Sequence, residues 1–107
     1  MTFEELIEEV KKVEFHEVRS QQKNYMEVVI AKKNMDSLLS VFESYFGVPL
    51  KPEGKPVTQE ATQHSQPYGG VQNNQTLYFQ KNNEGSTLAL LWPWGSGVLI
   101  TVKIVQK

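Results

Sequence analysis

The residues best suited to binding a ligand are two indoles and the polar side chains expected to lie beside them. Trp92 and Trp94 flank Pro93, and a double glycine followed by amide side chains precedes the strand that pairs with this region. Indole rings next to polar groups form the mixed apolar and polar hollow in which small molecules bind. The predicted ligand-binding residues are His64, Tyr68, Gly69, Gly70, Asn73, Asn74, Trp92 and Trp94. The competing interpretation is structural, with the indoles in the core and the glycines in a turn.

Other site chemistry is poorly represented in this sequence. His16 and His64 are the only histidines, Asp36 is the only aspartate, and cysteine is absent. Metal sites need several ligands in a defined geometry, so neither a metal nor a cofactor is predicted. A dispersed Ser/His/Asp arrangement stays open, but no nucleophile elbow is present, and no catalytic residue is assigned.

Three antiparallel strands between Thr76 and Val105 are expected to position the indoles. Residues 76–81 alternate as a strand does, and residues 82–85 form a turn rich in asparagine and glycine. Pairing Lys81 with Ser86 sets Thr76 opposite Leu91, which brings residues 68–75 beside residues 92–94. The second turn, residues 95–97, is predicted as a three-residue loop.

The register of that second turn decides which side chains share a face. A three-residue loop pairs Trp94 with Val98 and Leu90 with Val102, which collects the apolar side chains on one buried face. The other face is expected to be open, because two helices cover one side of such a sheet. That open face, or the edge of the strand over residues 98–105, is predicted to be a self-association surface. Its interface residues are Tyr78, Leu91, Leu99 and Thr101. A nucleic-acid platform is disfavoured, since one aromatic ring and one cation lie there.

The N-terminal half is predicted to supply two helices and a hairpin. Thr2 and Glu5 form a capping box that begins a helix over residues 3–13, with four glutamates near its start. Residues 14–19 are predicted to form a strand, with extension of the helix as the alternative. A turn over 20–24 and a strand over 25–31 follow. Asn34 begins a helix over residues 35–46 and Gly47 ends it, with Val48 folding back on Phe42. The acidic face is read as solvated surface, and docking of a basic partner is the alternative.

Residues 48–75 have no periodicity and contain four of the five prolines. Connections of this length in compact domains are functional loops, lids or disordered inserts. We expect a partly ordered loop; disorder and a short strand near Val57 are the alternatives.

The expected fold is a single α+β domain over residues 1–107. It has an antiparallel sheet of about five strands, made of a C-terminal three-stranded meander and an N-terminal hairpin, with two α-helices packed on one face. The chain has 107 residues, 39% hydrophobic and 21% charged, and a net charge of −1, which is typical of a soluble globular domain. Nucleic acid is an unlikely partner at this charge. The lack of cysteine, of a secretory leader and of a long apolar run predicts a cytoplasmic location without membrane contact.

These observations predict a non-enzymatic protein-interaction or binding module that self-associates, with a protein partner or a second copy as the ligand. The alternative is a small-molecule-binding protein or enzyme with a pocket between residues 64–75 and the two tryptophans. The sequence names neither the partner nor a reaction.

Overall fold

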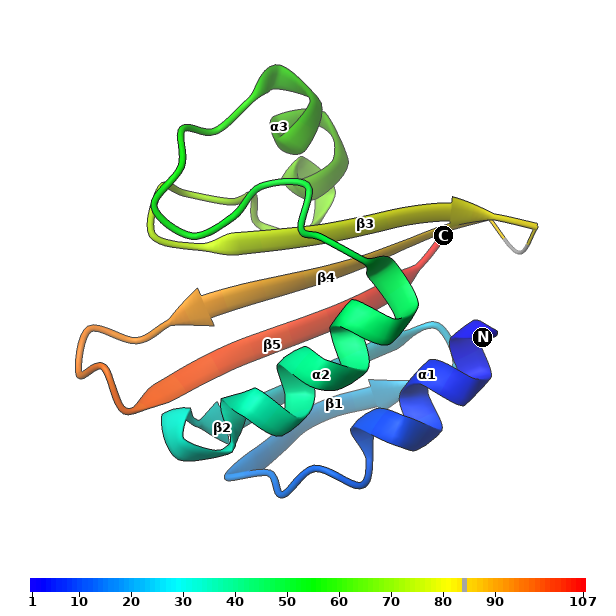
Figure 1. The fold of residues 1–107 in the computed structure, drawn as a ribbon, viewed down its shortest axis with the longest axis vertical. Helices are drawn as coiled ribbons and strands as arrows, with labels where there is room; N and C mark the ends of the chain where they lie inside the picture. The colour runs from blue at the N-terminus through cyan, green and yellow to red at the C-terminus, as the bar shows by residue number, and fades with distance from the viewer. Residues whose placement is uncertain (84) are drawn as a thin grey trace.

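The computed structural model describes residues 1–83 and 85–107 and confirms the α+β class. One antiparallel sheet carries its five strands in the order β1-β2-β5-β4-β3 (Figure 1). The strands are β1 (Glu17–Gln22), β2 (Tyr25–Ala31), β3 (Thr76–Asn82), β4 (Gly85–Pro93) and β5 (Leu99–Gln106). The helices are α1 (Phe3–Val10), α2 (Met35–Phe46) and α3 (Gln59–Ser65), with 3-10 turns η1 (Lys32–Asn34) and η2 (Gln66–Tyr68).

The register of the C-terminal meander is confirmed at one turn and wrong at the other. Lys81 pairs with Ser86 and Thr76 with Leu91, as predicted. In the second turn Trp94 donates its backbone N–H to the carbonyl of Leu99 at 2.9 Å, so the loop has one residue more than predicted and includes Val98. The shift pairs Leu91, not Leu90, with Val102.

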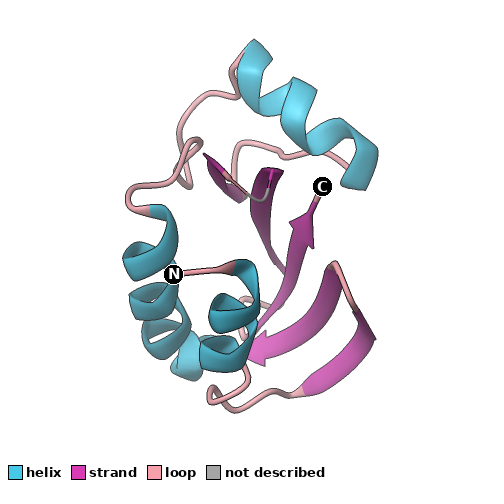
Figure 2. Cartoon of the chain, turned by 90° about the vertical axis from the view of Figure 1, so that its right-hand side faces the viewer, coloured by secondary structure: helices cyan, strands magenta, loops and turns pink. Residues whose placement is uncertain are grey.

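This shift has a physical reason, because both faces of the sheet are buried. Tyr78, Leu91 and Val102 belong to a core beneath α1 and α2. Leu77, Leu88 and Leu90 belong to a second core beneath α3, on the opposite face. Figure 2 shows helices on both sides of the strands. Collecting the apolar side chains on one face was therefore the wrong criterion for choosing the register.

The four predicted interface residues do not share one open face in this fold. Of the four residues expected to form an interface there, Tyr78 and Leu91 are buried, at 4% and 6% exposure. Thr101 is also buried and pairs with Trp92, so it lies on the face opposite to Leu91. Leu99 is half-buried on that same opposite face, two residues from Thr101. The strand over residues 98–105 is no edge either, since β5 lies between β2 and β4.

The N-terminal elements follow local signals in the sequence. The capping box of Thr2 and Glu5 is present, but α1 ends at Val10, three residues earlier than predicted. The first strand begins at Glu17 and continues to Gln22, so it runs through most of the predicted turn. The prediction for α2 is confirmed from Met35 to Phe46, and Gly47 ends it with a φ of 76°. Val48 is 85% exposed, so it does not fold back on the helix.

Residues 48–75 are ordered around a short helix, α3, that the sequence pattern did not indicate. Lys51 pairs through its backbone with Leu77 and closes part of the β3 edge. The Lys51 side chain is buried, and its ammonium donates to the carbonyls of Asn73 at 2.5 Å and Gln75 at 2.7 Å. No strand forms near Val57, which is exposed. Among the helices of the described residues, none has the length and apolar character to cross a membrane.

Candidate functional site

The structure brings Gly69, one of the predicted ligand-binding residues, against Trp92, and Lys103 links Tyr68 to the same ring. A Cβ atom built on Gly69 would lie 2.5 Å from Cη2 of the Trp92 ring, so only glycine fits there. On the same ring, Lys103 Nζ lies 3.8 Å from the ring centroid. The Lys103 ammonium also donates to the carbonyl of Tyr68 at 3.1 Å. These contacts fasten η2 to the sheet beside Trp92.

The other predicted site residues are held elsewhere. His64 stacks on Phe79 with ring centroids 3.9 Å apart. Gly70 donates its N–H to the carbonyl of Ser65, within the turn that ends α3 and η2. The carbonyl of Asn73 accepts from Lys51, and Asn74 is exposed.

Trp94 belongs to a different part of the same face. Its Nε1 donates to Thr101 Oγ1 at 2.8 Å, and the guanidinium of Arg19 lies 5.4 Å from its ring centroid. Arg19 in turn pairs with Glu17 at 3.4 Å, so long polar side chains cover this part of the sheet. The two indoles therefore have different neighbours. Trp92 Nε1 is buried and has no hydrogen-bond partner among the described residues.

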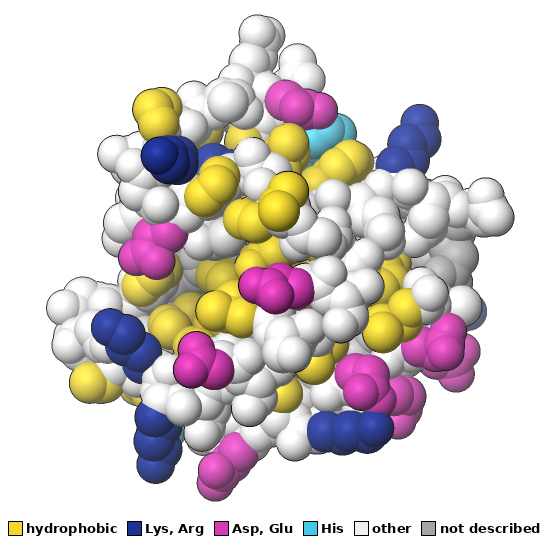
Figure 3. All heavy atoms as spheres, in the orientation of Figure 1, with side chains coloured by type: hydrophobic (Ala, Val, Ile, Leu, Met, Phe, Trp, Pro, Cys, Tyr) yellow, Lys and Arg dark blue, Asp and Glu magenta, His cyan; other side chains and the backbone are white. Residues whose placement is uncertain are grey.

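An apolar hollow lies on the opposite face, between α2 and the segment that follows it. We name it the α2 groove. It has a volume of about 340 Å³. Its lining residues are Lys32, Met35, Asp36, Leu39, Pro49, Pro52, Glu53, Thr76, Tyr78, Leu91, Pro93 and Ile100. Figure 3 shows hydrophobic side chains gathered in a hollow on this face.

Five separate parts of the chain build the α2 groove: α2 with the 3-10 turn before it, residues 49–53, β3, β4 and β5. Met35 and Leu39 are four residues apart on α2, so both point toward the same side of the helix. Tyr78, Leu91 and Ile100 come from three adjacent strands and are at most 9% exposed, which makes them the floor. Pockets that bind ligands are of this kind, mostly apolar with few polar groups.

The polar groups of the α2 groove are two hydroxyls and three charges. Burial raises the pKa of the Tyr78 phenol, and the nearby Glu43 carboxylate adds to that effect. The phenol is therefore neutral at ordinary pH, and its hydroxyl makes no hydrogen bond within the described part of the chain. Lys32, Asp36 and Glu53 are exposed at the rim. The ion pairs of residues 1–83 and 85–107 involve none of these three side chains.

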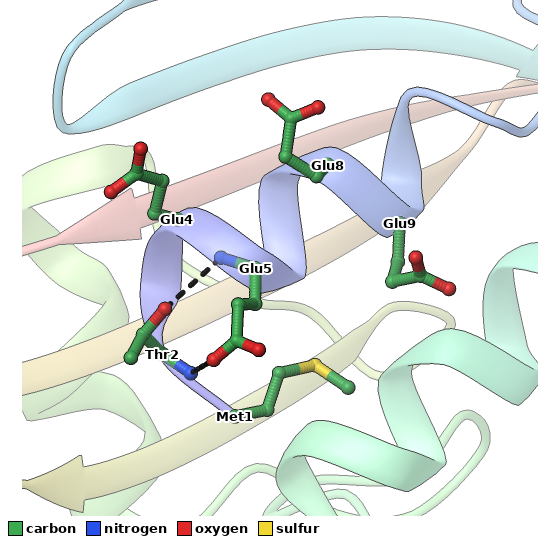
Figure 4. A pocket seen from close by; sticks show the side chains of 6 residues that line it. All are labelled: Met1, Thr2, Glu4, Glu5, Glu8 and Glu9. Carbon is green, nitrogen blue, oxygen red and sulfur yellow. Dashed lines mark hydrogen bonds between the residues drawn. The ribbon is translucent and has the colours of Figure 1, made fainter.

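A second hollow, of about 410 Å³, lies along α1 and is lined by Met1, Thr2 and four glutamates. Figure 4 shows Glu4 and Glu8 on one side of the helix and Glu5 and Glu9 on the other. Three of the carboxylates have partners: Glu5 accepts from the Thr2 N–H, Glu8 pairs with Lys11, and Glu9 pairs with Lys12. In the part of the chain that the structure describes, no three His, Cys, Asp or Glu side chains are grouped to hold a metal. This surface is a charged, solvated helix face.

The α2 groove could not be located from the sequence, for a specific reason. The apolar stripe of α2, which includes Met35 and Leu39, is visible in the sequence, and so is the proline content of residues 48–75. Neither signal says that Pro49 and Pro52 pack near Pro93, because that depends on where the chain crosses the sheet edge. An apolar lining that reaches the surface has the same hydrophobic pattern as a buried core. The sequence pattern therefore assigns both to the core.

Comparison with known proteins gives no relative for this chain: no family model, no curated protein and no solved structure matches it.

Proposed function

We propose that this chain is a non-catalytic protein-interaction module that binds an apolar segment of a partner in the α2 groove. The observation that carries the proposal is the apolar floor of Tyr78, Leu91 and Ile100, which is reached from the surface through a hollow of about 340 Å³. Hydrophobic patches that remain open at the surface of a folded protein mark interaction sites.

The lining favours an apolar ligand over a charged one. Four aliphatic or thioether side chains and three prolines surround the space, and the charged groups are confined to the rim. Burying one Leu, Ile or Val side chain of a partner contributes about 1.5–3 kcal/mol. The floor also offers the Tyr78 and Thr76 hydroxyls, which can accept or donate one or two hydrogen bonds and so fix the orientation of a bound segment.

No catalytic step is part of the proposal. The lining residues of the α2 groove include no histidine and no cysteine, and the two carboxylates of the lining, Asp36 and Glu53, are exposed at the rim. Activation of a nucleophile requires an adjacent base or a lowered pKa, whereas the pKa of Tyr78 is raised.

The test is binding of a neutral apolar probe, N-phenyl-1-naphthylamine, followed by its fluorescence with protein at low micromolar concentration. Leu39→Glu places a carboxylate in the groove and should weaken binding about tenfold or more, because burial of a charge opposes an apolar ligand. Ser40→Glu is the matched control, since Ser40 is exposed on the same helix and does not line the groove. It should leave binding unchanged.

Leu39 is half-buried, so a variant at an exposed position removes ambiguity about folding. Pro52 is exposed on the rim, and Pro52→Glu should also weaken probe binding while the thermal melt is unchanged. Amide chemical shifts should move around Met35 and Leu91 on adding the probe. Equal probe binding by all four proteins, or shifts confined to the α3 face, would refute the proposed function.

A further inference from the structure

We propose that the occupant of the α2 groove is a second copy of this chain, whose β4–β5 turn inserts Val98 into the groove of its partner. This inference rests on the proposed function, because it names the partner that the groove receives. It is carried by three observations: an exposed apolar residue beside the groove, a rim of mixed charge, and sheet edges that do not favour strand pairing.

The exposed apolar residue is Val98, at 60% exposure. Its carbonyl accepts the N–H of Lys32 at 2.9 Å, which fixes the turn against the rim of the groove. Pro93 and Ile100, on either side of the same turn, line the groove itself. Val98 therefore lies at the rim of the groove, two residues along the chain from Ile100 of its floor.

A protruding apolar residue next to an apolar hollow is self-complementary under a twofold axis. In such a dimer, residue i of one copy contacts residue j of the other, and residue j contacts residue i. Val98 of each copy can then occupy the groove of the other, so one small surface forms two equal contacts. Twofold pairing also closes on itself, which limits the assembly to two chains.

The charges at the rim agree with a second copy as the occupant. Lys32 carries one sign and Asp36 and Glu53 carry the other. None of the three forms an ion pair among the described residues, and Glu53 has only a longer-range interaction with Lys51. A twofold axis places one copy's rim against the other's. Lys32 of each copy can then meet Asp36 or Glu53 of the other copy, which gives two such contacts per dimer. A rim of a single sign would repel its own copy.

The sheet edges offer a poorer route to self-association. At the β3 edge, Lys51 already pairs with Leu77. The β1 edge has an irregular register between Val18 and Ser20, and it carries the Glu17–Arg19 ion pair. Bulges and charges on an edge strand prevent pairing with another sheet. The β4–β5 turn and the α2 groove remain the favoured contact.

The first test uses two exposed valines in different places. Val98→Asp should convert the dimer to a monomer in sedimentation equilibrium measured from about 1 to 300 µM chain, because the carboxylate would be buried in the partner's groove. Val18→Asp is the matched control: Val18 is 51% exposed on β1, outside the groove, and its variant should dimerise like the unaltered chain.

The second test exchanges charges across the interface. Lys32→Glu and the double change Asp36→Lys/Glu53→Lys should each weaken self-association about tenfold or more, since each homodimer then sets like charges against one another. An equimolar mixture of the two variants should recover the original affinity as a heterodimer, because both rim contacts again join opposite charges. Loss of a fold cannot produce that recovery.

The outcomes separate this inference from the proposed function. A chain that stays monomeric at about 300 µM, or a Val98→Asp variant that still dimerises, overturns the inference. In either case the naphthylamine probe still decides whether the groove binds apolar groups. If both proposals hold, monomeric Val98→Asp should bind the probe with the affinity of the unaltered monomer, because its own groove is intact.

Discussion

The double glycine before β3 allows backbone conformation to be separated from close packing in one experiment. Gly69 and Gly70 both have positive φ, at 106° and 82°. A Cβ on Gly69 would lie 2.5 Å from Cη2 and 3.0 Å from Cζ2 of Trp92, whereas a Cβ on Gly70 would have nothing within 4 Å. Alanine at either position incurs the backbone cost, but only alanine at 69 collides with the indole.

The expected losses in the free energy of unfolding follow from the left-handed backbone and from the collision with the indole. A left-handed alanine costs roughly 1–2 kcal/mol, and the reduced entropy of the unfolded chain offsets about 0.4–1 kcal/mol of it. Gly70→Ala should therefore lower the free energy of unfolding by about 1 kcal/mol. Gly69→Ala adds overpacking against a ring held by Lys103, which costs about 1–3 kcal/mol, for a total of about 2–4 kcal/mol.

The assay is urea unfolding of both variants, followed by circular dichroism and by tryptophan fluorescence. A double variant with Trp92→Leu should recover part of the cost of Gly69→Ala, with a coupling of about 0.5–3 kcal/mol, because the colliding ring is gone. The same change should not help Gly70→Ala. Equal costs for the two glycine variants would refute the placement of η2 against Trp92, and with it the anchoring of residues 48–75 on the sheet.

Two further predictions concern buried polar groups. The hydroxyl of Tyr45 lies 2.9 Å from that of Thr87, which is fully buried, so Tyr45→Phe should lower the free energy of unfolding by about 1–3 kcal/mol in urea. Ser44→Ala, at an exposed neighbour, should lower it by less than about 0.5 kcal/mol. Equal costs for the two variants would contradict the buried hydrogen bond. Burial lowers the pKa of Lys51 from its usual 10.5, so between the lowered value and 10.5 the unfolded chain binds more protons and stability rises with pH. Urea unfolding at stepped alkaline pH should show this rise in the unaltered chain relative to Lys51→Met, and identical pH profiles would contradict it.

Elements with a local signal at each end could be predicted from the sequence. The capping box at Thr2 and the glycine at 47 place the start of α1 and the end of α2 correctly. The hairpin of β3 and β4 was also predicted in register, because Lys81 and Ser86 flank a turn whose residues are typical of turns. These interactions span few residues, so neighbouring sequence contains the information that determines them.

α3 could not be predicted from hydrophobic periodicity, because its buried residues are small. Ala61 and Ser65 are its only buried residues, four apart on one side of the helix. The Ser65 hydroxyl donates to the Ala61 carbonyl at 2.7 Å, which satisfies a polar group inside the core. The one usable signal was Thr58, whose side chain accepts from the Ala61 N–H and caps the helix.

The predicted ligand-binding residues show which part of a site can be reached from sequence. The pairing of Thr76 with Leu91 implied that the chain before β3 ends near Trp92, and the structure places Gly69 there. Whether the space beside Trp92 is hollow depends on side chains from other strands. Lys103 reaches the Trp92 ring from β5, at a register one residue away from the predicted one.

The α2 groove arises where one chain covers both faces of its sheet. α2 lies over one face and ends at Gly47, and α3 lies over the other. Between them the chain must pass around the edge strand, and it does so at the bridge of Lys51 with Leu77. The prolines just before and after this bridge cannot donate to the sheet, so the segment turns away and leaves the strand ends beside α2 uncovered. The hollow is thus a consequence of the crossing, and its apolar floor is the core of the first face continuing to the surface.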